Sequence, residues 1–411
     1  MKAATKQHKA IFIANALMHF DNALYGYLVP IIAPLFFPNQ KVIVQLILGY
    51  GLFITSFLAK PFGVLFFSKM AQTKEEAVTL RYTLLGAGIS LIAIGFLPSY
   101  QDEPLWSVVL LILFRICIEA CSAGEHNVAK LYLLKEVSTE QAKEISVFYE
   151  VSTMLGILLA GAVGTLFALV DYSAPYWRIP FVLAGVLTLL NLVVFRFRPT
   201  DSVSSVEPIP VHQKAHSGYF MQLWKERVPI MRIAIVTGFG HVTYIIPFVF
   251  IHSFVPMVTD ISYSTMMQYV PVFMLLDIVL LSWMGSVCRK YDHNNLMAVA
   301  SLLIGLSIIP LFRGLSGASM LYVTIVRCWL IFCGVVFSCF ITVWSKEQIS
   351  KTTPYLTIGF ATVLGSSLFG KSATTICFYL FHWSNNPMLP ACYIAILAIV
   401  SAMIMADSAS E

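Results

Sequence analysis

Hydrophobic residues gather along this chain in twelve long runs that are separated by shorter polar segments. The runs begin near Ile11, Val42, Tyr82, Leu105, Ser146, Ile179, Pro229, Thr265, Leu296, Ser319, Tyr355 and Met388. Each holds roughly 17–27 mostly apolar residues, which is enough for a helix to cross a hydrocarbon layer about 30 Å thick. The pattern therefore predicts an all-α integral membrane protein.

Charged residues inside the runs are few and unevenly distributed. They are Asp21, Lys60, Arg115, Glu119, Glu125, Lys130, Glu150, Asp277, Arg327 and Lys371. Runs three, six, nine and twelve carry none deep in their interiors. Because a charge that faces lipid is costly, the charged helices are expected to line a shared polar cavity, with the charge-free helices outside it. This distribution is typical of a protein that moves a solute.

Composition and charge narrow the class further. With 58% hydrophobic and only 11% charged residues, a water-soluble domain is excluded. If the N-terminus is cytoplasmic, most basic residues outside the runs lie on the cytoplasmic face, whereas only Lys41, Arg178 and Arg313 lie on the other. The positive-inside rule then predicts that both termini are cytoplasmic. The net charge of +5 follows this topology, so no nucleic-acid partner is expected.

A polar segment rich in Ser, Pro and Lys divides the runs into two groups of six. We predict an N-terminal six-helix bundle over residues 1–198, a central cytoplasmic linker over 199–228 and a C-terminal six-helix bundle over 229–411. A faint repeat links the halves, because Arg115 precedes Cys121 by six residues and Arg327 precedes Cys333 by six. Duplicated halves would place such residues at matching depths in the membrane.

The fourth run carries a polar stripe. Arg115, Glu119, Ser122, His126 and Lys130 fall within about a quarter of the circumference of a helix. Arg115 and Glu119 are one turn apart and can form an ion pair, which lowers the cost of burying either residue. The pair is either a structural clamp or a binding device, in which the planar guanidinium offers its donors to a substrate carboxylate.

Two buried carboxyl groups are candidate proton carriers. A carboxyl group in a cavity of low dielectric constant holds a proton more readily than one in water, so Asp21 or Glu125 could load a proton on one side of the membrane and release it on the other. Tyr25, one turn from Asp21, is placed to hydrogen-bond it. The alternative for both carboxyl groups is a purely structural contact between helices.

The C-terminal half supplies buried cations of its own. Arg327 and Lys371, together with Arg115, predict a cavity that favours an anionic or zwitterionic solute. Asp277 is expected either to neutralise one of these cations or to contact the solute. Lys60 is expected either to reach toward the membrane surface or to pair within the N-terminal half.

Other chemistry finds no support in the sequence. There is no Walker loop, nucleophile elbow or zinc-protease His pair, so neither an enzyme nor an ATP-driven pump is expected. The cysteines form no CxxC pair, and we expect no metal and no cofactor.

Three local patterns resemble the metabolite:proton symporter branch of the major facilitator superfamily, which includes bacterial proline/betaine, citrate, 2-oxoglutarate and shikimate carriers. They are His19-Phe20-Asp21 with Tyr25-Gly26 and Phe36-Phe37-Pro38, then Arg115 with Ser122-Ala123-Gly124-Glu125, and finally Tyr176-Trp177-Arg178-Ile179-Pro180-Phe181. The resemblance covers most of the N-terminal half, whereas the C-terminal half shares only the general layout of spans.

The resemblance implies two six-helix bundles around a central cavity that is lined by spans one, four, seven and ten. It also implies proton-coupled import of a small carboxylate or zwitterion by a monomer in a bacterial inner membrane. In this reading Arg115, Arg327, Lys371 and Tyr25 bind the solute, Asp21 and Glu125 carry the proton, and Glu119, His126 and Asp277 support the ion pairs or line the cavity.

The sequence also departs from the family pattern. Gly63 is kept in the loop motif after the second span, but Gln72 and Thr73 stand where the superfamily usually has Asp-Arg. In the fourth span, Ile118 and Glu119 replace the Gln and Gly of the branch. The alternative is an exporter or importer of another metabolite, siderophore or drug on the same fold. The charges retained in both halves argue against a non-transporting membrane sensor, and no convergent His/Asp cluster supports a membrane-embedded enzyme.

Overall fold

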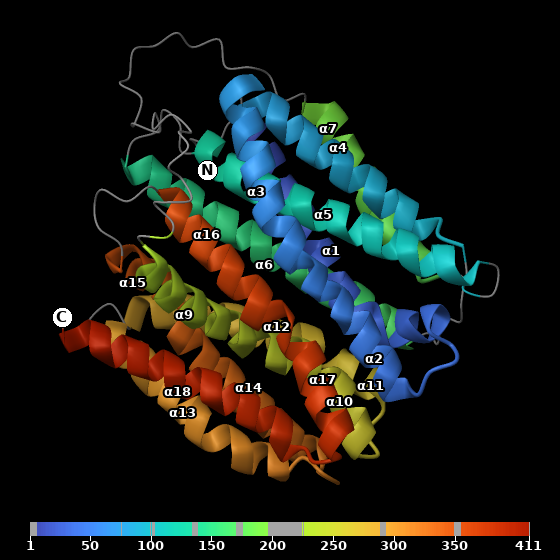
Figure 1. Cartoon of the computed structure of the whole chain (residues 1–411), viewed down its shortest axis with the longest axis vertical. Helices are drawn as coiled ribbons and strands as arrows, with labels where there is room; N and C mark the ends of the chain where they lie inside the picture. The colour runs from blue at the N-terminus through green and yellow to red at the C-terminus, as the bar shows by residue number, and fades with distance from the viewer. Residues whose placement is uncertain are drawn as a thin grey trace. The chain divides into compact units, whose positions relative to one another are not determined.

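A computed structural model describes residues 6–74, 76–98, 100, 103–133, 139–169, 176–195, 224, 226–287, 293–348 and 355–410. Within these ranges every regular element is helical and no strand occurs. Almost all of the predicted linker 199–228 lies outside the described residues, as do Lys135 and the loop residues 288–292. The chain separates into two compact units, and each is described by itself (Figure 1).

The first unit comprises Met1–Gln40 and Thr55–Pro208. Its helices are α1 (Lys6–Phe36), α3 (Thr55–Lys74), α4 (Glu76–Gly95), α5 (Pro104–Leu133), α6 (Thr139–Leu169) and α7 (Arg178–Phe195). Their most extensive contacts are α1 with α6, α3 with α5 and α4 with α7, and α4 also packs closely against α5. The charge-free third and sixth spans, α4 and α7, thus lie side by side, as Figure 1 also shows.

The second unit comprises Lys41–Ile54 and Ile209–Glu411. Its elements up to the eighth span are α2 (Val42–Gly51), η1 (Leu52–Ile54), α9 (Arg227–Ile245), η2 (Ile246–Phe250), α10 (Ile251–Val258), α11 (Tyr263–Gln268) and α12 (Val270–Val287). The remaining elements are α13 (His293–Arg313), α14 (Met320–Ser338), α15 (Ile341–Glu347), α16 (Tyr355–Gly365), η4 (Ser366–Lys371), α17 (Ala373–Ser384) and α18 (Met388–Ser410).

The two units use the same pairing of helices. In the first unit the paired spans are one with five, two with four and three with six. In the second unit α9 packs against α16, α12 against α14 and α13 against α18, which pairs span seven with eleven, eight with ten and nine with twelve. The faint sequence repeat around Arg115 and Arg327 therefore has a counterpart in the packing.

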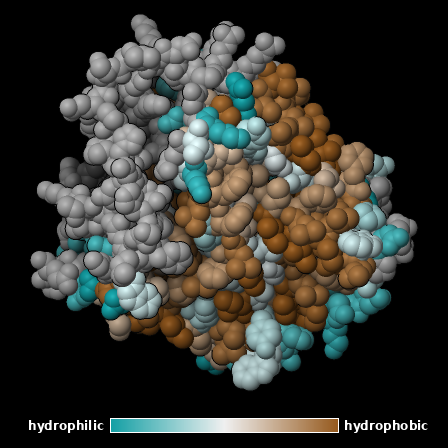
Figure 2. Space-filling model, turned by 45° about the horizontal axis from the view of Figure 1, so that its top comes forward, coloured by the Kyte–Doolittle hydropathy of each residue, from teal (hydrophilic) through white to brown (hydrophobic). Residues whose placement is uncertain are grey.

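The described residues contain nine helices that are long and apolar enough to cross a membrane. The shorter α7, the long α1 and the helical stretch from α16 through α17 account for the other predicted spans. Large apolar side chains such as Leu58, Phe96 and Leu306 are exposed, and Figure 2 shows broad hydrophobic areas on the face that it presents. Such surfaces are expected where a protein is solvated by lipid.

The second span is shared between the units. Its first part, α2, belongs to the second unit and packs against α17, where the Tyr50 hydroxyl lies 2.7 Å from that of Ser253 and the Tyr50 ring stacks on Phe378 at 5.6 Å. Its second part, α3, belongs to the first unit. The 3₁₀ turn of η1 joins the two parts. The predicted bundle boundaries at residues 198 and 229 stay a prediction.

Candidate functional site

Close helix packing positions the polar residues of the first unit. A Cβ atom at Gly63 of α3 would overlap the backbone of Ala120 in α5, so only glycine allows this approach. Lys60 lies one turn before Gly63 and Glu119 directly precedes Ala120. The contact between α3 and α5 therefore brings the two charged residues together.

A second close contact joins α1 to α6, where a Cβ atom at Gly156 would overlap the backbone of Ala16. Beside it the Asn15 amide donates to the Tyr149 carbonyl at 3.0 Å, to the Ser152 hydroxyl at 2.8 Å and to the Thr153 hydroxyl at 2.7 Å. This buried cluster fixes the rotation of α1. It was not predicted, although an Asn in an apolar run and a facing glycine are the signals that could have indicated it.

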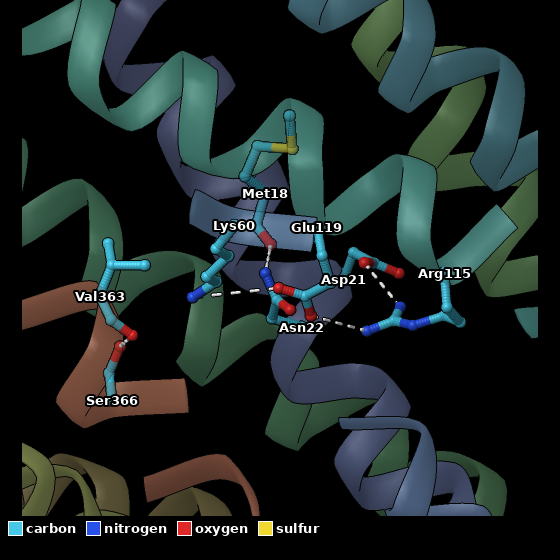
Figure 3. A network of polar contacts seen from close by, with 8 residues as sticks. All are labelled: Met18, Asp21, Asn22, Lys60, Arg115, Glu119, Val363 and Ser366. Atoms are coloured by element: carbon cyan, nitrogen blue, oxygen red, sulfur yellow. Dashed lines mark hydrogen bonds and ion pairs between the residues drawn. The ribbon is translucent and has the colours of Figure 1, made fainter. Parts of the chain in front are cut away.

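Four charged side chains form a chain of alternating sign in the first unit (Figure 3). The Arg115 guanidinium donates to Asp21 Oδ2 at 3.0 Å and to Glu119 Oε1 at 3.4 Å. The Lys60 ammonium lies 3.9 Å from Glu119 Oε2. Helices α1, α3 and α5 each contribute to the network, and the predicted Arg115–Glu119 ion pair is present.

Burial of the network is nearly complete. Asp21, Arg115 and Glu119 expose at most 1% of their side chains, and the Arg115 guanidinium lies 4.4 Å from the centre of the Tyr25 ring. Burying ions carries a large desolvation cost, which the alternating charges and the aromatic face offset. Removing one member would leave an uncompensated charge in the interior, so the members depend on one another.

Glu125 lies further along α5 than the network, six residues after Glu119 or roughly 9 Å along the helix axis. It is ten residues after Arg115 on α5, or roughly 15 Å along the helix axis, and is 1% exposed. Its neighbour His126 is exposed, and its Nδ1 lies 3.0 Å from the hydroxyl of Tyr149 in α6. The structure thus separates the two predicted proton carriers, placing Asp21 beside Arg115 and Glu125 elsewhere. The side chain of Lys130 lies outside the described residues.

The second unit holds the other predicted site residues. Arg327 of α14 is fully buried, and its guanidinium lies 4.1 Å from the centre of the Phe273 ring in α12. Lys371 ends the π-helical turn η4, with its ammonium 5.5 Å from the centre of the Phe53 ring. Asp277 makes no hydrogen bond or ion pair with another described residue. Its predicted role stays a prediction.

Comparisons with known proteins assign the family. The family model of the Major Facilitator Superfamily matches residues 11–367. The proline/betaine transporter of Escherichia coli K12 is 21% identical over 415 residues, covering 96% of this chain and 82% of that protein. A Staphylococcus aureus (strain COL) protein, provisionally named a proline/betaine transporter, is 23% identical over 419 residues, covering 98% and 88%.

Solved structures agree in fold. The E. coli xylose transporter in a partially occluded inward open conformation matches with a TM-score of 0.75 at 12% identity, covering 98% of this chain and 97% of that one. Because so low an identity carries information on fold alone, the match supports the twelve-helix arrangement and not a substrate. With a family model that spans most of its length, the chain belongs to the major facilitator superfamily of membrane transporters.

Proposed function

We propose that this transporter imports a small carboxylate-bearing or zwitterionic solute, with proline or a betaine as representatives, together with a proton. We further propose that it acts as a monomer in a bacterial inner membrane with both termini in the cytoplasm. The names of its bacterial relatives support the solute class. The observation that carries the proposal is the direct contact of Asp21 with Arg115 at 3.0 Å.

That contact links a proton acceptor to a carboxylate receptor. While Asp21 is ionised, it competes with any solute carboxylate for the Arg115 guanidinium. When Asp21 takes a proton, its attraction to Arg115 falls, and the planar donors become available to the solute. Binding of the solute and of the proton would then favour one another, which is the thermodynamic requirement for symport.

Other residues have subsidiary roles in this proposal. Tyr25 offers a ring face that suits the cationic part of a zwitterion as well as the guanidinium. Arg327 and Lys371 are the solute-attracting cations of the second unit. Glu125 is a second proton carrier, and His126, which follows it on α5 and contacts Tyr149 of α6, has a supporting role.

Uptake into proteoliposomes tests the function. Radiolabelled proline and glycine betaine are offered under an inwardly directed proton gradient, with a protonophore and protein-free vesicles as controls. We expect accumulation that the protonophore abolishes. Accumulation that survives the protonophore would contradict proton coupling. Failure to transport either solute, combined with transport of a sugar or a carboxylate-free drug, would contradict the solute class.

A further inference from the structure

The cation at the accessible end of the charge network is Lys60. Its side chain is 17% exposed, whereas those of Asp21, Arg115 and Glu119 are at most 1% exposed. Of the two cations in the network, Lys60 is therefore the one whose side chain is accessible without displacement of a buried group. We propose that Lys60 is a solute-binding residue, and that a solute carboxylate binds between Lys60 and Arg115 in the place that Glu119 occupies.

The geometry around Glu119 supports this assignment. Its carboxylate lies between the two cations, with Oε1 3.4 Å from Arg115 and Oε2 3.9 Å from Lys60, as Figure 3 shows. A guanidinium and an ammonium on either side of one carboxylate form a site that a solute carboxylate could also bind. Glu119 therefore acts as an internal stand-in for the solute, and its displacement exchanges one ion pair for another.

Lys60 is loosely held, as a receptor for an exchangeable ligand should be. Its distance of 3.9 Å from Glu119 exceeds hydrogen-bond length, and it makes no hydrogen bond with another described residue. An ammonium has three donors and gains most from acceptors within about 3 Å. Arg115, by contrast, already donates to two carboxylates. The Lys60–Glu119 contact is the longest of the three ion pairs in the network, so a solute can replace it most readily.

Backbone packing fixes where Lys60 can reach. Gly63 lies one turn after it on α3 and is pressed against Ala120, so the register of α3 on α5 is set beside Glu119. A lysine that merely reached toward the membrane surface would need no such register. The position is consistent with a residue that works together with Glu119.

The inference rests on the proposed function and makes a sharper statement about the solute. A carboxylate is required at this position, so glycine betaine and proline should use Lys60. Choline, which resembles glycine betaine but has a hydroxymethyl group in place of the carboxylate, should gain nothing from it. Comparing these two compounds isolates the contribution of the carboxylate.

The test measures equilibrium binding of glycine betaine and choline to the full chain in lipid nanodiscs. The variants are Lys60→Gln, Lys60→Arg and the control Lys69→Gln, which makes the same change at an exposed position of the same helix. We expect Lys60→Gln to weaken glycine betaine binding by roughly 10- to 100-fold and to leave the weak binding of choline unchanged. Lys60→Arg should keep most of the affinity, and Lys69→Gln all of it.

Several outcomes would decide against the inference. Wild-type affinity for glycine betaine in Lys60→Gln would overturn it while leaving the proposed function intact. Equal losses for choline and glycine betaine would overturn it as well, because the carboxylate would then not be the group recognised. If Lys60→Gln unfolds, the charge-balanced double variant Lys60→Gln/Glu119→Gln replaces it and is compared with Glu119→Gln alone, relative to which the same loss is expected. If the wild-type protein binds neither proline nor glycine betaine, the proposed function itself fails.

Discussion

At the scale of single residues, Arg115 is the centre of the charge network, because it contacts Asp21, Glu119 and the Tyr25 ring. Arg115 combines two functions. It compensates two buried carboxylates, and in the proposed mechanism it also receives the carboxylate of the solute. Substitution of Arg115 alone cannot separate these functions, because loss of the guanidinium removes the ion-pair partner that Asp21 and Glu119 share, and Glu119 keeps only its longer contact with Lys60.

A pair of variants separates them. Arg115→Gln should lower the free energy of unfolding by about 3–5 kcal/mol, the usual cost of leaving a buried ion without its partner. Adding Asp21→Asn and Glu119→Gln removes the stranded charges and should recover thermal stability without recovering affinity for glycine betaine. The exposed Arg313→Gln is the control for charge loss. If the triple variant, which keeps Lys60 as its one charged network residue, binds with full affinity, Arg115 is a structural clamp only.

The second residue-scale prediction concerns Glu125. Glu125→Gln removes the titratable group and preserves its size, so it should abolish accumulation driven by a pH gradient. Exchange of labelled for unlabelled solute at equal concentrations needs no net proton movement and should survive. Asp21→Asn is the comparison variant. Because it also changes the contacts of Arg115, it should reduce both gradient-driven accumulation and solute exchange. Gradient-driven accumulation in Glu125→Gln would assign proton carriage to another group.

At the scale of helices, glycine contacts set the geometry of the site. Gly63→Ala would place a methyl group against the backbone of Ala120, which cannot move as a side-chain tip could. We expect the variant to lose about 1–3 kcal/mol of stability, in the range of overpacked cores. Gly359→Ala in α16 is the matched control, since a Cβ atom there would meet nothing within 4 Å. Equal melting temperatures of the two variants would show that α3 and α5 are not held at this contact.

The sequence predicted the spans well and their partners poorly, for a physical reason. Hydropathy along the chain reports whether a segment suits lipid, so span existence follows from local composition. The Asp21–Arg115 contact joins residues 94 positions apart and depends on how α1 packs against α5. Only the Arg115–Glu119 pair, one turn apart on one helix, was accessible to local reasoning. For the same reason, sequence alone left open whether Lys60 pairs or reaches toward the membrane surface.

Interruptions within spans were also beyond the sequence. The π-helical segment η2 contains Pro247, which lacks a backbone donor and favours such a departure from α-helical bonding. The segment η4 contains no proline but follows Gly365, which packs against the backbone of Ala234. The cause of the π-helical turn in η4 is therefore a tertiary contact, which the hydrophobic pattern of the sequence does not reveal.

At the scale of the whole molecule, fold and substrate are governed by different parts of the chain. The xylose transporter shares the arrangement of helices at 12% identity, although its named substrate has no carboxylate. A fold that tolerates such change must be specified by hydrophobic pattern and close helix contacts. Substrate choice is then left to a small number of polar side chains. We expect the charge network of α1, α3 and α5 to be among these substrate-selecting side chains.

The distribution of basic residues predicts the orientation in the membrane. Within the second unit, ion pairs join Arg232 near the start of α9 to Asp407 near the end of α18, and His293 at the start of α13 to Glu347 at the end of α15. The alternation of spans across the membrane predicts that these two pairs of helix ends lie on the same face of the unit. Because basic loops are retained on the cytoplasmic side, this face and the C-terminus are expected to be cytoplasmic.

Reporter fusions test this orientation directly. Green fluorescent protein fused after Glu411 should fluoresce, since it folds in the cytoplasm, whereas alkaline phosphatase at the same point should be inactive. Alkaline phosphatase fused after Gly317, in the turn between α13 and α14, should be active, because one helix separates that turn from the cytoplasmic start of α13. An active phosphatase at Glu411 together with an inactive one at Gly317 would reverse the orientation.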